Sequence, residues 1–346
     1  MHTTEESTKT LAFAHGGPAG CGAIRSTAED FVVDEELGFD LTGEGEHVFV
    51  RIKKRGENTE FLARRLARYA GVTPRDVSYA GLKDRHAVTT QWFSVHLPGR
   101  PDPQWSGFAD ESFRVLKAKR HNRKLRRGAL SGNTFRIVVR DVKINWDCFE
   151  ETLGAIADGG VPNYFGEQRF GRNGGNITQA IDLLSGRLKL RDRHKQGLLL
   201  SAARAHLFNE VLSERVEAGS WNTALPGDTF AFDRSNRYFR TEALDQHILE
   251  RVAGMEIHPT GPLWGAGPLE VSGEGRRLES EIAARHPELS GGLERFGVDM
   301  ARRTLRVRAD GLNWDLASDG SLALSFSLAA GAYATTLLRE LMRLGG

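Results

Sequence analysis

The sequence of 346 residues contains only two cysteines, Cys21 and Cys148. Two cysteines cannot build the disulfide framework of a small secreted domain, and no CxxC pair is present for zinc or redox chemistry. No apolar run approaches the roughly 20 residues that a membrane span requires, and residues 1–10 lack the apolar core of a signal peptide. We therefore expect a cytoplasmic protein, in a reducing compartment and without a membrane anchor.

Several common catalytic motifs are also missing from the sequence. It has no GxxxxGK[ST] loop for nucleotide phosphates, no HExxH pair for zinc and no GxSxG turn for a nucleophilic serine. Its histidines are scattered, although their spacing alone leaves a Ser-His-Asp triad open. We expect neither a metal nor a nucleotide cofactor.

One charge pattern is pronounced, although the formal net charge is only +2. Between Arg114 and Arg127, eight of the fourteen residues are Lys or Arg and none is acidic. Such a run repels itself and can neutralise phosphates, so it predicts contact with nucleic acid. The alternatives are a solvated face and a surface for an acidic protein. Our candidates for contacts to a nucleic-acid backbone are Lys83, Arg120, Arg123, Lys124, Arg126 and Arg127.

A single carboxylate stands among cationic side chains in YAGLKDRHAVTTQWFSV, Tyr79–Val95. Asp84 lies between Lys83 and Arg85 in an expected turn that precedes a β-prone run. Neighbouring cations favour the ionised form of a carboxylate, which suits a nucleophile better than a proton donor. The plainer interpretation is a solvated turn aspartate with local ion pairs, and position alone favours it.

Residue patterns along the chain predict an α+β protein. Expected strands cover 31–37, 47–54, 92–97, 133–142, 304–309 and 322–328, and expected helices cover 145–157, 198–216 and the last residues of the chain. Another helix is expected after Asn58 or Thr59, because Leu62, Leu66 and Tyr69 recur at helical spacing. Composition shifts near residue 160, where a Gly-rich and aromatic segment (Val161–Asn176) predicts a structured turn at a domain boundary. The strand-rich ends and mixed middle indicate an inserted domain.

Two aromatic residues and an asparagine begin expected strands. Phe31 starts one strand, and Asn133 and Phe135 start another. A ring at such a position can stack on an unpaired base, and an asparagine side chain can bind the edge of a uracil. The alternative, that these side chains belong to the core, is the more common one.

Taken together, several long segments resemble one family. AGLKDRHAVTTQW, GNTF and VPNYFGEQRFG occur in this order, after EDFVVDEELGFDLTGEGEHVFVRIKK and before LSAARAHLFN and AAGAYATTLLREL. The chain resembles the TruD family of tRNA pseudouridine synthases from about Ile24 to about Leu344.

This resemblance implies the fold, the domains and the activity. The fold would be the pseudouridine-synthase fold, a mixed, mostly antiparallel sheet flanked by helices, with an inserted TruD-specific α/β domain. The implied domains are a flexible tail over 1–20, a catalytic domain over 21–159 and 307–346, and an insertion over 160–306. The protein would be a monomer that isomerises a tRNA uridine, at position 13 in bacteria, to pseudouridine without cofactor or metal.

The resemblance also assigns roles to six residues. Asp84 matches the catalytic aspartate, which either attacks the ribose as a nucleophile or first abstracts a ribose proton. Arg25, where relatives carry Lys, would keep that carboxylate ionised. The side chains placed near the uridine are Phe31, Asn133, Phe135 and Tyr333, the last at a position where bacterial relatives often carry Phe.

Two other functions remain open from the sequence. A non-catalytic RNA-binding or RNA-folding protein would use the same basic surface, and Asp84→Asn would then keep the full effect. A carboxylate-dependent glycoside or nucleoside hydrolase would need a second acid near Asp84 and would release a free base.

Overall fold

The computed structural model describes residues 11–126, 128–235, 237–241 and 243–345. The chain divides into two compact units by its internal contacts. The large-sheet unit comprises Ala19–Trp146, Ala309–Gly331 and Met342–Gly346. The helix-rich unit comprises Met1–Pro18, Asp147–Arg308 and Ala332–Leu341.

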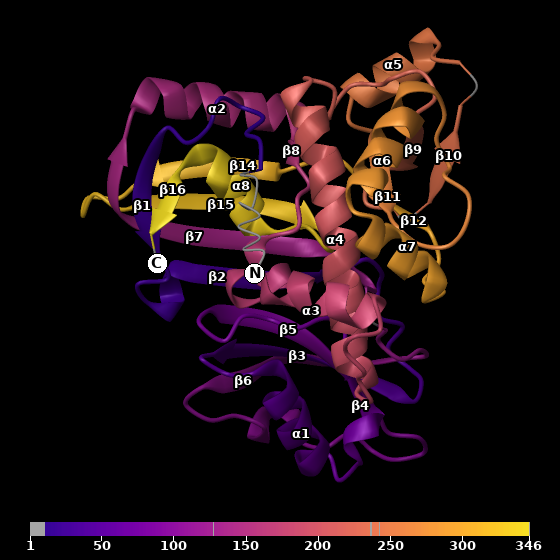
Figure 1. Ribbon diagram of the computed structural model, residues 1–346. Helices are drawn as coiled ribbons and strands as arrows, with labels where there is room; N and C mark the ends of the chain where they lie inside the picture. Colours follow the sequence, from indigo (N-terminus) through magenta and orange to yellow (C-terminus); the bar gives the residue numbers. More distant parts are fainter. Residues whose placement is uncertain (1–10, 127, 236, 242, 346) are drawn as a thin grey trace. The chain divides into compact units, whose positions relative to one another are not determined.

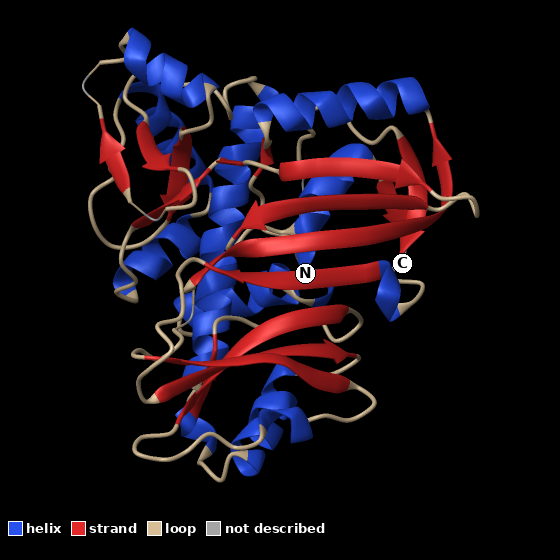
Figure 2. Ribbon diagram, turned by 180° about the vertical axis from the view of Figure 1, so that it is seen from behind, coloured by secondary structure: helices blue, strands red, loops and turns tan. Residues whose placement is uncertain are grey.

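A ten-stranded sheet organises the described part of the large-sheet unit. Its main path is β14-β15-β7-β2-β5-β3-β6, from top to bottom in Figure 1 and in red from behind in Figure 2. Along this path β2 and β5 are parallel, and the other neighbours are antiparallel. The expected mixed, mostly antiparallel sheet is thus confirmed. The strands are β14 (Asp310–Leu316), β15 (Leu322–Ala329), β7 (Leu130–Ile144), β2 (Phe31–Leu37), β5 (Val88–His96), β3 (His47–Arg55) and β6 (Phe113–His121), with β1 (Gly20–Ile24) and β16 (Arg343–Gly345) paired beside β7 and β4 (Val77–Tyr79) beside β5.

Strand register sorts the side chains of this sheet onto two faces. Phe135 of β7 lies opposite Val33 of β2 and Phe326 of β15, and Lys54 of β3 lies opposite Thr89 of β5. Val33 and Thr89 are paired in turn, and directly paired residues project to the same face. One face, which we call the inner face, therefore carries Phe31, Val33, Glu35, Lys54, Thr89, Asn133, Phe135 and Phe326.

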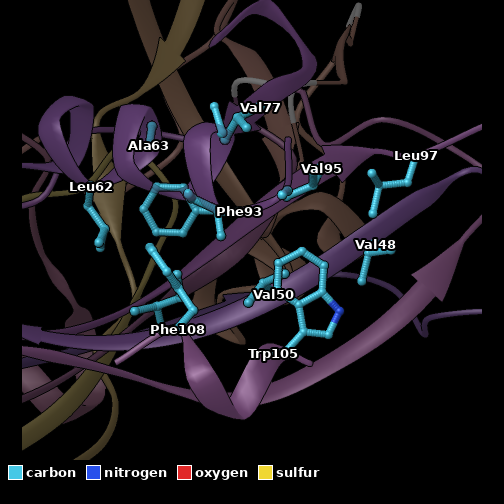
Figure 3. Packing of buried hydrophobic residues seen from close by; sticks show 14 of the residues in the cluster. Val48, Val50, Leu62, Ala63, Val77, Phe93, Val95, Leu97, Trp105 and Phe108 are labelled. Atoms are coloured by element: carbon cyan, nitrogen blue, oxygen red, sulfur yellow. The ribbon is translucent and has the colours of Figure 1, made fainter. Parts of the chain in front are cut away.

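Helix α1 (Thr59–Tyr69) covers part of the inner face. Asn58, one of the two caps that the sequence leaves open, accepts hydrogen bonds from the main-chain N–H groups of Glu60 and Phe61. Leu62 packs with Val50 and Phe93 of the sheet in a buried cluster (Figure 3). This packing holds the β3–α1 turn against the sheet.

The helix-rich unit is built around the 25-residue helix α4 (Arg193–Glu217). Leu199, Ala203 and Leu207 recur along it and are buried in one cluster. Its other helices are α2 (Trp146–Gly159, of which the first residue belongs to the large-sheet unit), α3 (Gly175–Leu184), α5 (Gln246–Ala253), α6 (Gly273–Arg285), α7 (Pro287–Arg295) and α8 (Ala334–Leu341). Its strands are β9 (Thr229–Phe232), β10 (Tyr238–Arg240), β11 (Ile257–Leu263) and β12 (Ala301–Thr304) in one sheet, with β8 (Val161–Pro162) and β13 (Arg306–Val307) as a separate pair.

Most predicted elements are found within a few residues of their expected bounds, with two exceptions. The prediction of a single strand over 304–309 was wrong, because the chain changes its pairing partner at Leu305. The strand before it, β12, pairs with β11, and the strand after it, β13, pairs with β8. The basic run was given no secondary structure, but its first part is the edge strand β6.

The described part of the predicted flexible tail is held in place. Arg339 donates hydrogen bonds to the carbonyls of Leu11 and Ala12, and Glu340 accepts from the main chain of Ala14 and His15. The expectation of a flexible tail is therefore wrong for residues 11–18, whereas residues 1–10 lie outside the described residues. The predicted insertion, 160–306, falls within the helix-rich unit, but that unit also contains α8 and all of α2 after its first residue. The domain boundaries given above stay a prediction.

Candidate active site

The loop between β4 and β5 carries Asp84 and is fixed on both sides of it. The Gln91 side chain donates a hydrogen bond to the Gly81 carbonyl at 2.6 Å. The main-chain N–H of Lys83 donates to Thr59 Oγ1 at 3.2 Å, and that of His86 donates to Asp84 Oδ1 at 2.9 Å. These bonds define both the path of the loop and the direction of the carboxylate.

Arg25 provides the ion-pair partner of Asp84. Its Nη2 lies 2.9 Å from Asp84 Oδ2, and the two side chains are 27% and 23% exposed. The guanidinium also lies over the Phe31 ring, 4.3 Å from the centroid, in a cation–π contact. The φ angle of Arg25 is +61°, a left-handed conformation that costs roughly 1–2 kcal/mol for a residue with a side chain. The structure thus brings Arg25, Asp84 and Phe31 together, and strained backbone of this kind is typical of functional sites.

The predicted uridine-pocket rings are packed side by side on the inner face. Phe31 and Phe135 are in edge contact at 6.4 Å between centroids, and Phe135 stacks on Phe326 at 5.4 Å. Phe31 and Phe135 are only 5% and 7% exposed. Both are core residues in this structure, as the alternative interpretation predicted, and stacking of either ring on a base stays a prediction.

Asn133 offers an unused hydrogen-bonding atom on the same face. Its Oδ1 is buried and has no hydrogen-bond partner among the described residues. Buried polar atoms nearly always have a partner, so an unpaired one calls for an explanation. A ligand with an N–H group would supply the missing partner.

Below the loop, Lys83 turns into the protein and away from solvent. Its Nζ lies 2.6 Å from Glu35 Oε1, and its side chain is only 10% exposed. Glu35 Oε2 accepts a hydrogen bond from the main-chain N–H of Trp92 at 2.8 Å. Burial raises the pKa of Glu35, against the opposing effect of Lys83. The assignment of Lys83 as a contact to RNA backbone is therefore wrong for this structure.

A second lysine, Lys54, is buried beside the same loop. It is 1% exposed, and its Nζ donates to the Glu57 carbonyl at 2.7 Å and to the Asp84 carbonyl at 3.4 Å. Burial lowers the pKa of Lys54 to about 8. Sequence analysis missed Glu35 and Lys54, although the alternation of each strand gave a signal. Glu35 continues the inward series of Phe31 and Val33, and Lys54 continues that of Val50 and Ile52.

The basic run divides into residues with structural partners and residues that face solvent. Arg120 donates to Asp102 and to the carbonyls of Gly45, Leu97 and Arg100. Its assignment as an RNA contact is wrong here, because its donors hold the neighbouring turns together. Arg123, Lys124 and Arg126 are exposed, with Lys124 also donating to the Arg75 carbonyl. These three stay predicted RNA contacts, and Arg127 lies outside the described residues.

Tyr333 belongs to the helix-rich unit, where the Val161–Asn176 segment surrounds it. Arg169 donates to Tyr333 Oη at 2.7 Å from Nη2 and at 3.2 Å from Nε. The Phe165 ring lies 6.1 Å from the Tyr333 ring, and a Cβ on Gly166 would lie 3.4 Å from Tyr333 Cδ1. This segment was expected to be only a boundary turn, so sequence analysis missed Arg169. The place of Tyr333 in a uridine site stays a prediction.

Two features are absent from the described residues. No three His, Cys, Asp or Glu side chains are grouped in a way that could hold a metal ion. In the same part of the chain, no helix combines the length and the apolar character needed to cross a membrane.

Comparison with known proteins gives consistent matches over nearly the whole chain. The family model described as tRNA pseudouridine synthase D (TruD) matches residues 9–184 and 172–341. The tRNA pseudouridine synthase D of Methylococcus capsulatus is 51% identical over 332 residues, which cover 96% of this chain and 94% of that protein. The protein of the same name from Nitrosococcus oceani is 46% identical, covering 99% of this chain and 96% of its own.

A solved structure matches as well. It is the crystal structure of a Methanosarcina mazei protein described as tRNA pseudouridine synthase D (TruD), with a TM-score of 0.68. The match covers 96% of this chain and 95% of that one at 22% identity. It confirms the expected α+β fold.

Proposed function

This chain belongs to the TruD family and is a tRNA pseudouridine synthase, and we propose that Asp84 is the nucleophile of its reaction. We further propose that its substrate is uridine 13 of tRNA. The observation that carries the role of Asp84 is its geometry: a partly exposed carboxylate on a fixed loop, paired with Arg25 at 2.9 Å.

The reaction moves a base on its own ribose. The bond between N1 of uracil and C1′ breaks, the base turns, and C5 bonds to C1′. C5 then loses its proton and N1 gains one, so product and substrate contain the same atoms. Because nothing is oxidised or reduced, we propose that no cofactor takes part.

Asp84 would attack C1′ while the base leaves. A carboxylate nucleophile is effective when it is ionised and held in line with the reacting carbon. Arg25 holds Oδ2 of this carboxylate in a direct ion pair, and the hydrogen bond from the His86 N–H fixes the other oxygen, Oδ1.

The uridine has to leave its stack to reach this carboxylate, at a cost of a few kcal/mol. We propose that the unpaired Oδ1 of Asn133 accepts a hydrogen bond from the uracil N3–H group. Arg123, Lys124 and Arg126 would bind the RNA backbone, which contributes affinity more than choice of sequence.

The test is pseudouridine mapping on unmodified tRNA transcripts, without added metal or nucleotide. The wild-type protein should modify position 13, and Asp84→Asn should not. Asp34→Asn is the matched control, because Asp34 lies in β2 on the opposite face of the sheet, and it should keep activity. Modification at position 13 by Asp84→Asn would overturn the assigned role. If the wild type and both variants bind RNA but none of them modifies it, the protein would instead be a non-catalytic RNA-binding protein.

A further inference from the structure

Lys54 is a buried cation to which the proposed chemistry assigns no role. It is the inward residue of β3 directly opposite Thr89, and it is among the largest side chains with almost no exposure. Removing an ammonium group from water is costly unless it is well paired. A lysine is therefore an unfavourable choice for this position unless its ammonium has a function there.

The partners of the Lys54 ammonium point to that function. Both of the hydrogen bonds that the structure records for it go to main-chain carbonyls, that of Glu57 at 2.7 Å and that of Asp84 at 3.4 Å. The first anchors the ammonium to the turn that precedes α1. The second joins it to the main chain of the proposed nucleophile.

We propose that Lys54 is a positioning residue: its ammonium joins the β3–α1 turn to the main chain of Asp84 and thereby holds the carboxylate in line with its target. This role rests on the proposed function of Asp84. A shift of about 1 Å in a reacting group can cost on the order of 100-fold in rate, so a bond to the nucleophile's own carbonyl is well placed to matter. Lys54 would act on kcat and not on tRNA binding, since it is too buried to touch the RNA backbone.

The charge state of Lys54 gives this role a pH signature. The charged groups that face its ammonium are Asp84 and Lys83 in the loop, Glu57 in the turn and Glu35 in β2. Burial is the largest influence, and it lowers the pKa of Lys54 to about 8. The ammonium is therefore present below pH 8 and is lost as the pH rises through that value. We expect kcat to fall over the same range.

The experiment compares Lys54→Met with Lys53→Met on unmodified tRNA over pH 6.5–9.5. Methionine keeps the bulk of the side chain without its charge, and Lys53 is the neighbouring lysine on the opposite face of β3. Lys54→Met should lower kcat at neutral pH by roughly 10- to 100-fold, the effect of losing a charge-assisted hydrogen bond. The KM of this variant for tRNA should stay within about threefold of the wild-type value, and its kcat should no longer decline near pH 8. Lys53→Met should behave like the wild type.

Thermal unfolding separates this role from a purely structural one. Burial disfavours the ammonium, so Lys54→Met should melt at or above the wild-type temperature while it loses activity. If Lys54→Met keeps wild-type kcat and the same pH profile, the role is wrong. If Lys54→Met fails to fold, the dependence of kcat on pH in the wild type tests the role instead. A kcat that stays level through pH 9 contradicts the role, and a decline near pH 8 supports it. A wild-type protein that makes no pseudouridine would instead overturn the proposed function itself.

Discussion

Arg25 and Asp84 meet at 2.9 Å in the large-sheet unit, one just after the end of β1 and the other in the loop before β5. Arg25 reaches this position from a left-handed backbone conformation, and its guanidinium rests on the Phe31 ring. One side chain thus connects the proposed nucleophile to the aromatic part of the inner face.

Replacing Arg25 should lower the rate more than it lowers binding. Arg25→Ala removes the cation that is paired with Asp84 Oδ2. Because a misplaced reacting group can cost on the order of 100-fold in rate, kcat should fall by roughly 10- to 100-fold. Arg25→Lys keeps the charge but loses the planar guanidinium and its contact with the Phe31 ring. Its kcat should lie between those of Arg25→Ala and the wild type. Single-turnover rates of pseudouridine formation check this order. Arg85→Ala, in the same loop but exposed, is the control, and an equal loss in that variant would contradict a specific role for Arg25.

The buried pair of Lys83 and Glu35 should behave as one unit in stability. Lys83→Met removes the cation that lies 2.6 Å from the buried Glu35 carboxylate, and breaking such a pair costs about 3 kcal/mol. Adding Glu35→Gln should restore much of the lost stability, because the neutral amide no longer needs a cation. Thermal unfolding of the two single variants and the double variant measures the coupling. Additive losses, or weaker tRNA binding at unchanged stability, would show instead that Lys83 faces the RNA.

Local patterns in the sequence were sufficient for some of these features and not for others. Alternation located β2 and β3, and helical spacing located α1, because each pattern depends on neighbouring residues. The direction of a charged side chain depends on which strands become neighbours. Nothing adjacent to Lys83 or Arg120 in sequence shows that Glu35 or Asp102 will lie beside it. Arg25 was linked to Asp84 only through a family resemblance, and Arg169 was not linked to Tyr333 at all.

Two parts of the basic run should respond differently to mutation. Arg123 and Arg126 are exposed, so replacing both with alanine should weaken tRNA binding and reduce the salt dependence of log Kd by about one unit per lost phosphate contact. The melting temperature of this double variant should equal that of the wild type. Arg120→Ala should instead lower the melting temperature, since Arg120 holds Asp102 and three carbonyls. Binding titrations at several salt concentrations, paired with melting curves, separate the two effects. A stable Arg120→Ala variant with weak tRNA binding would reverse the assignment.

His258 should make the helix-rich unit sensitive to acid. Arg306 Nε donates to His258 Nδ1 at 3.0 Å, so the ring proton is on Nε2 and is donated to Asp233 Oδ1, also at 3.0 Å. Burial is the main reason that the pKa of His258 lies below its usual 6.5. A proton on Nδ1 would oppose the Arg306 donor. The folded protein therefore holds His258 neutral at pH values where the unfolded chain takes up a proton.

Because only the unfolded chain takes up this proton readily, the protein should lose stability as the pH falls. Above about pH 6.5 His258 is neutral in both states, and its contribution to stability is complete. As the pH falls below that value, the unfolded state gains a proton that the folded state resists, so stability drops by at most about 1.4 kcal/mol per pH unit. Melting temperatures between pH 7.5 and 5 should show this drop in the wild type and in the exposed-histidine control His194→Gln. His258→Gln should have a lower melting temperature at pH 7.5 but a flatter dependence on pH. An equally steep decline in His258→Gln would assign the acid sensitivity to another group.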